Sequence, residues 1–492
     1  MSVSPTLPPN PSHVPSPNSS PGPSQNSSPG PSPSRSSLPP EASPLAHRTV
    51  RRLLAPVQAF LQIEAASGIA LMIATALALV WANSPWAHSY HDLWHLPVGL
   101  GVGEWSFVRP LHFWVNDVLM AVFFFVVGLE IRRELHAGEL SDLKRATLPL
   151  AAALGGMLLP AGIYAVLNYG RAGIHGWGVP MATDIAFAVG VLALLGPRVP
   201  PALRILLLAL AVIDDIGAIV VIAIFYTDGV APSGLGVAAA GGLGILLLQR
   251  IGLRSAWHYV PAGAVVWVGL YQAGVHPTLC GVIVGLMTPA RAWVGAEGFS
   301  AQAAPLVADA GKQSPHELLG VLDEIERLRR EAVPPTVYLV HHLHRLVAFA
   351  IMPLFALANA GVSLGGADLS GDGLFVFLGV AVGLVVGKTF GIFVACRLTA
   401  ALGLSALPRD ARWTGVVLVG ITAGIGFTMS LFVAQLAFPP GALLETAKLA
   451  ILVGSTVAAL VGLAYGRLTL RPRAPDEAPF VDAATAESSA EV

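Results

Sequence analysis

Five acidic residues stand inside segments of this sequence that are otherwise strongly apolar. Two of them are adjacent, Asp214 and Asp215, within the stretch LALAVIDDIGAIVVIAIFY, and Asp184 lies within MATDIAF. The others are Asp117 and Glu130. A carboxylate in the apolar core of a bilayer is costly unless it faces a cavity, a partner or an ion. These side chains therefore predict a route for protons or cations across a membrane.

Asp214 and Asp215 must have different environments, because neighbours on an α-helix point about 100° apart. One can face an ion pathway while the other reaches a cation on a neighbouring helix, and close like charges favour protonation of at least one carboxyl group. Protons would then compete with a hard cation such as Na⁺ or Li⁺ for the same oxygens. The alternative is a hydrogen-bonded pair with only a structural role, which the cost of burial in a membrane disfavours.

The composition is that of a polytopic membrane protein. Hydrophobic residues make up 54% of the 492 residues and charged residues 12%, whereas soluble domains contain about 25% charged residues. The formal net charge of −1 gives no sign of nucleic-acid binding. Membrane lipid is the expected surrounding.

About twelve segments are long enough to cross the ~30 Å apolar core of a bilayer. They lie near 64–83, 112–135, 146–168, 177–195, 203–226, 233–249, 257–273, 276–290, 342–363, 374–396, 411–436 and 444–466. Basic residues gather in alternate links between these segments. The positive-inside rule then places both termini in the cytoplasm, for a multi-pass protein of a bacterial inner membrane.

The remaining segments divide the chain further. Residues 1–50 are rich in Pro and Ser and predict a disordered cytoplasmic tail, and 468–492 predict a second one. The membrane domain covers 51–467, with a cytoplasmic insertion at 291–340 in which Ser314-Pro315-His316-Glu317 predicts the capped start of an amphipathic helix. Short apolar runs around three glycines near 94–107 predict a small β-hairpin in the first outside link.

Two of the predicted spans contain breaks. Gly178 and Pro180 precede Asp184, and Gly424 and Gly426 interrupt ITAGIGFTMSLF in the eleventh span. Close helix packing is an alternative role for these glycines. If both helices unwind, two positive and two negative helix ends meet in the membrane, each with about half a charge. Asp184 would then compensate the positive ends. Lys388 of the tenth span would compensate the negative ends, unless it extends to the membrane surface instead.

Seven motifs in one order resemble the NhaA family of bacterial Na⁺/H⁺ antiporters. They are NDVLMAVFFFVVGLEIRREL, ATDIAF, IDDIGAI, GVHPTLCGVIVG, PLFALANAGV, GKTFGI and GIGFTMSLF. The resemblance implies an all-α polytopic membrane protein of about twelve transmembrane helices, with inverted-topology repeats at helices 3–5 and 10–12. Two discontinuous helices would cross at the midplane. The implied function is Na⁺(Li⁺)/H⁺ antiport, without a cofactor, that serves sodium and pH homeostasis.

The resemblance also implies roles for single residues. Asp214 and Asp215 would bind Na⁺ and protons, with Asp215 the main cation ligand and Asp214 the partner of Lys388. Thr183 and Asp184, on the broken fourth helix beside the site, would belong to the same cation- and proton-binding set. The remaining residues would form the pathway or set the pH response: Asp117, Glu130, Arg132, Glu134, His276 and His344.

The hairpin near 94–107 would carry the contact of a homodimer. One departure concerns pH sensing, because the family often has an acid before the histidine at the start of the ninth helix, where this chain has Val340. The neighbouring histidines could instead bind a metal, although no Asp, Glu or Cys is near them in the sequence.

Two other functions are weighed against this one. An intramembrane aspartyl protease also uses carboxylates on two membrane helices, but no span here has a G-x-G-D motif, and we expect no enzyme activity. A cation-coupled symporter on a similar scaffold would need a pocket for an organic solute. The adjacent acidic pair favours exchange.

Overall fold

A computed structural model describes residues 66–102, 105–227, 229–252, 256–310, 314–363, 365–408 and 410–470. These residues all belong to one compact unit, Ala59–Val492, and the other unit is Met1–Gln58. The tail predicted at 1–50 lies outside the described residues, as does the tail predicted at 468–492 from residue 471 onward.

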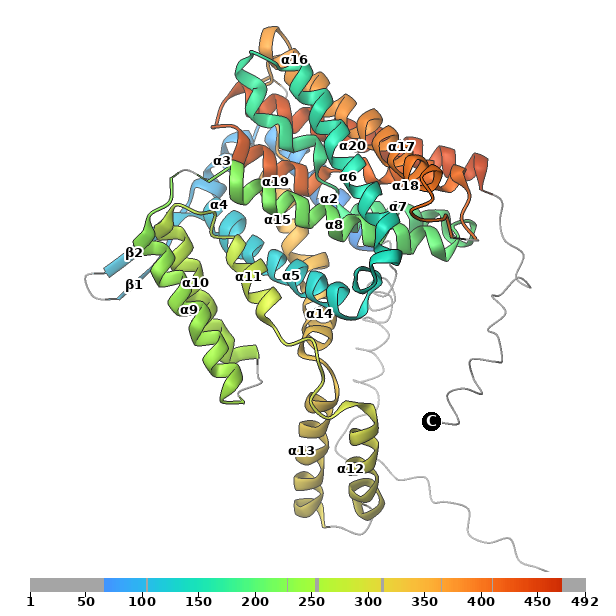
Figure 1. The fold of residues 1–492 in the computed structure, drawn as a ribbon. Helices are drawn as coiled ribbons and strands as arrows, with labels where there is room; N and C mark the ends of the chain where they lie inside the picture. The colour runs from blue at the N-terminus through green and yellow to red at the C-terminus, as the bar shows by residue number, and fades with distance from the viewer. Residues whose placement is uncertain are drawn as a thin grey trace, which may run out of the picture. The chain divides into compact units, whose positions relative to one another are not determined.

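The described residues are almost entirely helical, as the composition predicts (Figure 1). The first half contains α2 Ala66–Ala82, α3 Ala87–His95, α4 Leu111–Phe113, η1 Trp114–Leu119, α5 Met120–Ala137, η2 Glu139–Ser141, α6 Leu143–Leu167, η3 Ala172–Met181, α7 Ile185–Leu195, η4 Gly196–Arg198, α8 Pro201–Phe225 and α9 Pro232–Arg250. The second half contains α10 Ala256–Ala273, α11 Leu279–Met287, α12 Gly295–Ala310, α13 Pro315–Ala332, α14 Pro335–Leu346, η5 Val347–Ile351, α15 Met352–Asn359, α16 Gly371–Val382, η6 Gly383–Gly387, α17 Lys388–Ala401, α18 Trp413–Ala423, α19 Phe427–Ala437 and α20 Ala442–Thr469.

Seven helices in the described part of the chain are long and apolar enough to cross a membrane, and ten spans result if each bent helix pair counts as one. Three of these spans join several elements: Leu111–Ala137 (α4, η1 and α5), Pro335–Asn359 (α14, η5 and α15) and Gly371–Ala401 (α16, η6 and α17). Two of the twelve predicted segments do not meet this criterion, namely those that became α10 and α11. The helix α11 has nine residues, which rise only about 13 Å, because the turn at His276-Pro277-Thr278 delays its start.

The predicted hairpin is present, and it is the only sheet among the described residues. Strands β1 (Pro97–Val102) and β2 (Trp105–Pro110) pair antiparallel, from Pro97 opposite Pro110 to Val102 opposite Trp105. The indole of Trp114 donates to Val98 O at 2.9 Å and ties β1 to the start of the following span. The guanidinium of Arg109 lies over the rings of Phe113 and Tyr271, at 5.8 and 5.7 Å from their centroids.

The predicted capped helix in the insertion is α13. The Ser314 hydroxyl accepts from Glu317 N at 3.5 Å, and the Glu317 carboxylate accepts from Ser314 N at 2.9 Å, which completes the capping box. These bonds from Ser314 hold the pKa of Glu317 below its usual range. In Figure 1 the pair α12 and α13 extends beyond the ends of α5 and α14.

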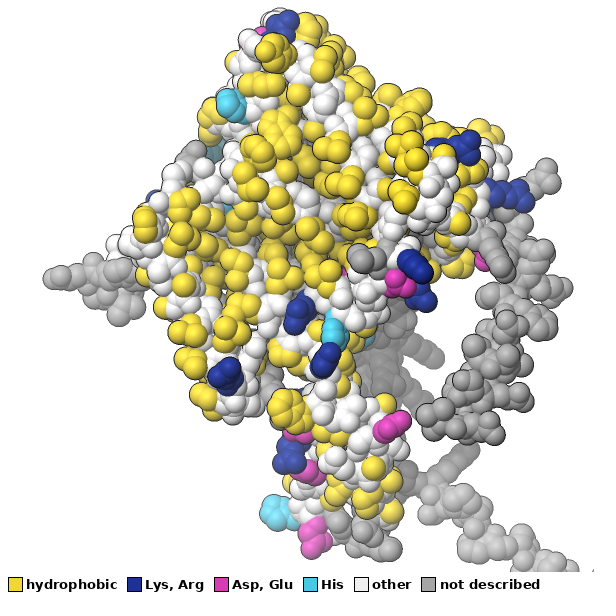
Figure 2. Space-filling view, viewed as in Figure 1, with side chains coloured by type: hydrophobic (Ala, Val, Ile, Leu, Met, Phe, Trp, Pro, Cys, Tyr) yellow, Lys and Arg dark blue, Asp and Glu magenta, His cyan; other side chains and the backbone are white. Residues whose placement is uncertain are grey.

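Apolar side chains cover the outside of the long helices. Leu158 and Val166 on α6 and Ile224 on α8 are largely exposed. On the face seen in Figure 2, hydrophobic side chains dominate, and most charged side chains lie near helix ends or over α12 and α13. Such a continuous apolar surface is unfavourable in water and suits contact with lipid.

Candidate functional site

Two broken helices contact each other at their breaks. The axis bends by 45° between η3 and the segment Ile185–Arg198, and by 47° between α18 and α19. The amide of Asp184 donates to Ile425 O at 2.7 Å, and the Ser430 hydroxyl donates to Val179 O at 2.8 Å. The two breaks predicted from glycine and proline are therefore present and lie against each other.

The glycines at the second break are required by close packing. A Cβ atom on Gly424 would lie 2.4 Å from the carbonyl oxygen of Leu384, and one on Gly426 would lie 2.9 Å from that of Ala182. Neither position has room for a side chain. At this break, the second broken helix therefore contacts two other parts of the backbone. One is the first broken helix, and the other is the span that carries Lys388.

Asp184 lies at the N-termini of both half-helices that follow the breaks. Its Oδ1 accepts from Phe187 N at 3.0 Å in the first turn of α7. Its Oδ2 accepts from Thr428 N at 3.2 Å and from the Thr428 hydroxyl in the first turn of α19. The side chain is buried. A carboxylate is favourable here because helix N-termini carry partial positive charge.

Lys388 lies on the opposite side of the breaks. Its ammonium group donates to Asp214 Oδ2 and to Thr183 Oγ1, and both charged side chains are fully buried, with 0% exposure. Thr183 Oγ1 lies 2.5 Å from Asp214 Oδ2 and 3.0 Å from Ala423 O, so its single proton can be donated to only one of them. Ala423 is the last residue of α18, and the cation thus stands close to a negative helix end.

Asp215 has a different environment from Asp214. It is 2% exposed, and within the described residues its carboxylate makes no hydrogen bond or ion pair. Asp214 Oδ1 is also buried without a partner in this part of the chain. The site therefore holds one ion-paired carboxylate beside an unpaired one, and carboxylate oxygens are the ligands that hard cations prefer.

The residues predicted for the pathway and the pH response do not form a single cluster in the structure. His344 Nδ1 lies 4.0 Å from Glu130 Oε1, which pairs α14 with α5, and Glu134 Oε1 lies 3.4 Å from the neighbouring Arg133. Arg132 is exposed on the same turn. About 20 Å of helix separate this end from Asp117, which is partly buried.

His276 lies with neither of these groups. Its Nδ1 lies 3.0 Å from Thr278 Oγ1, and its ring contacts that of Phe432, with centroids 5.6 Å apart. Within the described residues, no three His, Cys, Asp or Glu side chains gather as metal ligands would.

The sequence reasoning missed Thr428 as a partner of Asp184. Thr428 follows the glycines of the eleventh span, and a hydroxyl residue near the start of a half-helix is the signal that could have found it. A second feature associated with the site also went unpredicted. The helix that carries Lys388 has a π-helical turn, Gly383–Gly387, directly before the lysine. Such turns are frequent at functional sites.

Crossed broken helices, a buried lysine and four buried polar or acidic side chains define an ion transporter among multi-pass membrane proteins. The family model described as Na⁺/H⁺ antiporter 1 matches residues 58–465. The chain belongs to the NhaA family of Na⁺/H⁺ antiporters.

Three relatives illustrate the similarity. Na⁺/H⁺ antiporter NhaA 2 of Sorangium cellulosum is 59% identical over 433 residues, which cover 87% of this chain and 92% of the relative. Na⁺/H⁺ antiporter NhaA 2 of Myxococcus xanthus is 54% identical over 92% of this chain and 97% of its own length. Na⁺/H⁺ antiporter NhaA of a Janthinobacterium species is 50% identical over 89% and 98%. The family is one of transporters, and the chain is accordingly a multi-pass inner-membrane protein.

Proposed function

We propose that this antiporter exports Na⁺ or Li⁺ in exchange for protons, with Asp215 as the main cation ligand. The observation that carries the proposal is the contrast between the two neighbouring aspartates. Asp214 is bound by Lys388 and Thr183, whereas the buried Asp215 carboxylate has no partner among the described residues. An unpaired carboxylate in a membrane interior must take up either a proton or a metal cation.

Two protons leave the site for each cation that binds. Asp215 must lose its proton before its oxygens can bind Na⁺. If Na⁺ also contacts Asp214, it competes with the Lys388 ammonium, and repulsion between two cations in one buried site favours loss of the second proton from Lys388. Exchange of two H⁺ for one Na⁺ moves net charge. The membrane voltage, worth about 2.3 kcal/mol per charge and 100 mV, would then help to drive export.

Asp184 and Thr183 stabilise the contact between the two broken helices while protons and Na⁺ replace each other at the site. Asp184 compensates the two positive helix ends, and Thr183 links Lys388 to Asp214 beside the negative end at Ala423. No cofactor takes part in this cycle. The transported ions are Na⁺, Li⁺ and H⁺.

The pH response is assigned to the end of α5 opposite Asp117, where Glu130, Arg132, Glu134 and His344 gather. The 4.0 Å separation of Glu130 and His344 supports this assignment. In this proposal, Glu130 of another span takes the role of the acid that the sequence lacks at Val340. Asp117 and His276 would line the pathway elsewhere.

Two further proposals concern assembly and orientation. The charge pattern of the links supports cytoplasmic termini. The hairpin Pro97–Pro110 would pair two copies of the chain, because it presents a sheet edge. Cross-linking of single cysteines in the hairpin, in native membranes, tests the dimer.

Transport in everted membrane vesicles tests the proposed function. Na⁺, Li⁺ and K⁺ are added in turn over a range of pH, and the proton gradient and voltage are recorded with separate dyes. We expect Na⁺ and Li⁺, but not an inert cation such as choline, to dissipate the proton gradient, faster when the voltage is maintained. Exchange that ignores the voltage would contradict the two-for-one stoichiometry.

A further inference from the structure

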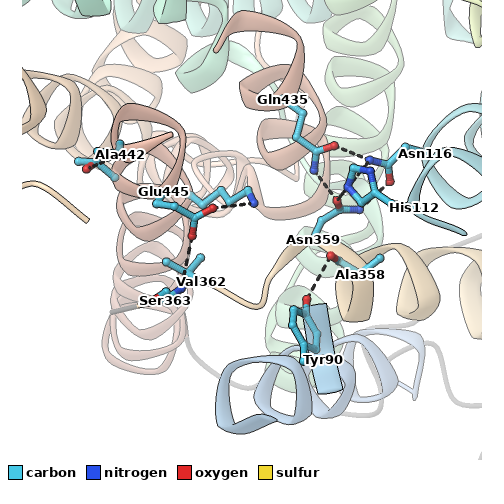
Figure 3. A network of polar contacts seen from close by, with 12 residues as sticks. Tyr90, His112, Asn116, Ala358, Asn359, Val362, Ser363, Gln435, Ala442 and Glu445 are labelled. Carbon is cyan, nitrogen blue, oxygen red and sulfur yellow. Dashed lines mark hydrogen bonds and ion pairs between the residues drawn. The ribbon is translucent and has the colours of Figure 1, made fainter. Parts of the chain in front are cut away.

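Three amide side chains outside the ion site form a closed hydrogen-bonded ring (Figure 3). They are Asn116 of η1, Asn359 at the end of α15, and Gln435 of α19, and together we call them the amide ring. Asn116 Nδ2 donates to Gln435 Oε1 at 2.5 Å, and Gln435 Nε2 donates to Asn359 Oδ1 at 2.5 Å. Asn359 Nδ2 donates to Asn116 Oδ1 at 2.8 Å and closes the ring.

His112 and the backbone complete the amide ring. His112 Nε2 lies 2.9 Å from Asn116 Nδ2 and 3.0 Å from Asn359 Oδ1, and Asn359 Nδ2 also donates to Phe355 O at 2.9 Å. Every amide group of the ring thus has a partner. Asn116 and Asn359 are buried, and Gln435 and His112 are partly buried. A polar network whose members are all hydrogen-bonded holds its elements in one defined arrangement.

The amide ring lies between the ion site and the hairpin end of the molecule. Asn116 is in the first two turns of Leu111–Ala137, which begins where β2 ends, and Asn359 is the last residue of Pro335–Asn359. Gln435 is in the last turn of α19. The ring therefore joins three spans near the ends that face the hairpin.

A layer of aromatic rings lies deeper in the same three spans. Phe124, Phe355 and Phe432 are buried, and the Phe432 ring lies 5.4 Å from that of Phe124 and 6.3 Å from that of Phe355, between centroids. Phe355 is one turn from Asn359, and Phe432 is one turn from Gln435. Along these three spans, the amide ring therefore lies nearer the hairpin than the aromatic layer does.

The amide ring also holds the half-helix that carries part of the site. The first turn of α19 donates to Asp184 through Thr428, and the last turn of α19 is fixed by Gln435. Movement of α19 away from η1 and α15 would open the hairpin side. It would have to break the hydrogen bonds of Gln435.

We propose that the amide ring closes the ion pathway on the hairpin side, and that Asn116, Asn359 and Gln435 determine how often the site faces that side. The proposal rests on the exchange function given above. Neutral amides suit this role because their bonds can be replaced by bonds to water at small net cost. A buried ion pair in the same place would leave an unpaired charge each time it opened.

The first test is Gln435→Met, which keeps the length of the side chain and removes both of its hydrogen bonds. Exchange is measured in membrane vesicles of both orientations, so that the half-saturating Na⁺ concentration is obtained separately for each side. The apparent affinity from one side scales with the fraction of molecules open to it. We expect the half-saturating concentration on the hairpin side to fall about tenfold, and that on the other side to stay or rise.

The matched control is Asn168→Leu. Asn168 is a buried amide that donates to Tyr164 O and Phe375 O, both at 3.1 Å, and it contacts no member of the amide ring. The Asn168→Leu change should lower thermal stability, but it should not change the half-saturating Na⁺ concentration on one side only. If Gln435→Met behaves like this control, or changes both sides equally, the proposed role of the amide ring is wrong.

A second variant keeps the test valid if Gln435→Met folds poorly. Asn116→Cys and Gln435→Cys are combined in a chain whose Cys280 and Cys396 are replaced by Ala, and a short bifunctional thiol reagent joins them. Exchange should stop on cross-linking, while the uncross-linked protein remains active. Continued exchange after complete cross-linking would refute the proposal. Absence of exchange in the wild-type protein would instead refute the function on which it rests.

Discussion

Removal of Lys388 and Asp214, singly and together, tests the buried ion pair. The single changes are Lys388→Met and Asp214→Asn, and the third variant carries both. Each single change leaves one charge in the interior without its partner, since both side chains have 0% exposure. Thr183 can retain a bond to Asp214 in the first variant, but a neutral hydroxyl does not replace the ammonium charge.

The expected magnitude follows from this burial. Breaking a buried ion pair by removal of one partner costs about 3–5 kcal/mol, so the two single changes would add up to about 6–10 kcal/mol. The double variant leaves no unpaired charge. Its loss in free energy of unfolding should therefore be smaller than that sum by at least about 3 kcal/mol. The free energy of unfolding of the purified protein, from denaturant titration in one detergent, gives all four values. Additivity to within about 0.5 kcal/mol would refute the pairing.

Three further predictions concern other parts of the structure. Thr428→Val removes a hydroxyl bond to the buried Asp184 carboxylate and should cost about 1–3 kcal/mol in the same titration, and an unchanged stability would contradict the assigned bond. Glu130→Gln should move the rising limb of the activity–pH profile to lower pH, because the carboxylate favours the imidazolium of His344, and an unmoved midpoint would exclude this pair from the response. If the hairpin pairs two copies as proposed, light scattering should find a dimer for the wild type and a monomer after deletion of residues 97–110, and a dimer that persists after the deletion would place the contact elsewhere.

The breaks in the two helices were predictable because their cause is local. Gly424 and Gly426 stand in a run of apolar residues where a helix would otherwise continue, and Pro180 precedes Asp184 in the same way. Once both breaks are expected, the charges at the helix ends give Asp184 and Lys388 their roles. Asp184 compensates the positive ends, and Lys388 compensates the negative ends. The contact of Lys388 with Asp214 does not follow from the breaks alone, and it was the resemblance to the NhaA family that implied it.

Other features depend on contacts between distant residues. Asn116, Asn359 and Gln435 share no spacing or pattern, and their ring exists only because three spans end at the same level. The pairing of Glu130 with His344 was likewise hidden, since the sequence drew attention to the apolar Val340 beside the histidines. The shortness of α11 depends on a turn at His276-Pro277-Thr278, which a hydropathy pattern does not reveal.

Asp215→Asn tests the central claim most directly. Asn keeps the shape of the side chain but cannot bind a proton as a carboxylate does, and Asp215 makes no hydrogen bond or ion pair within the described residues. The variant should therefore unfold at the same denaturant concentration as the wild type, and in proteoliposomes it should exchange no more Na⁺ for H⁺ than protein-free vesicles. Exchange at the wild-type rate by this folded variant would contradict the assignment of Asp215 as the cation and proton ligand.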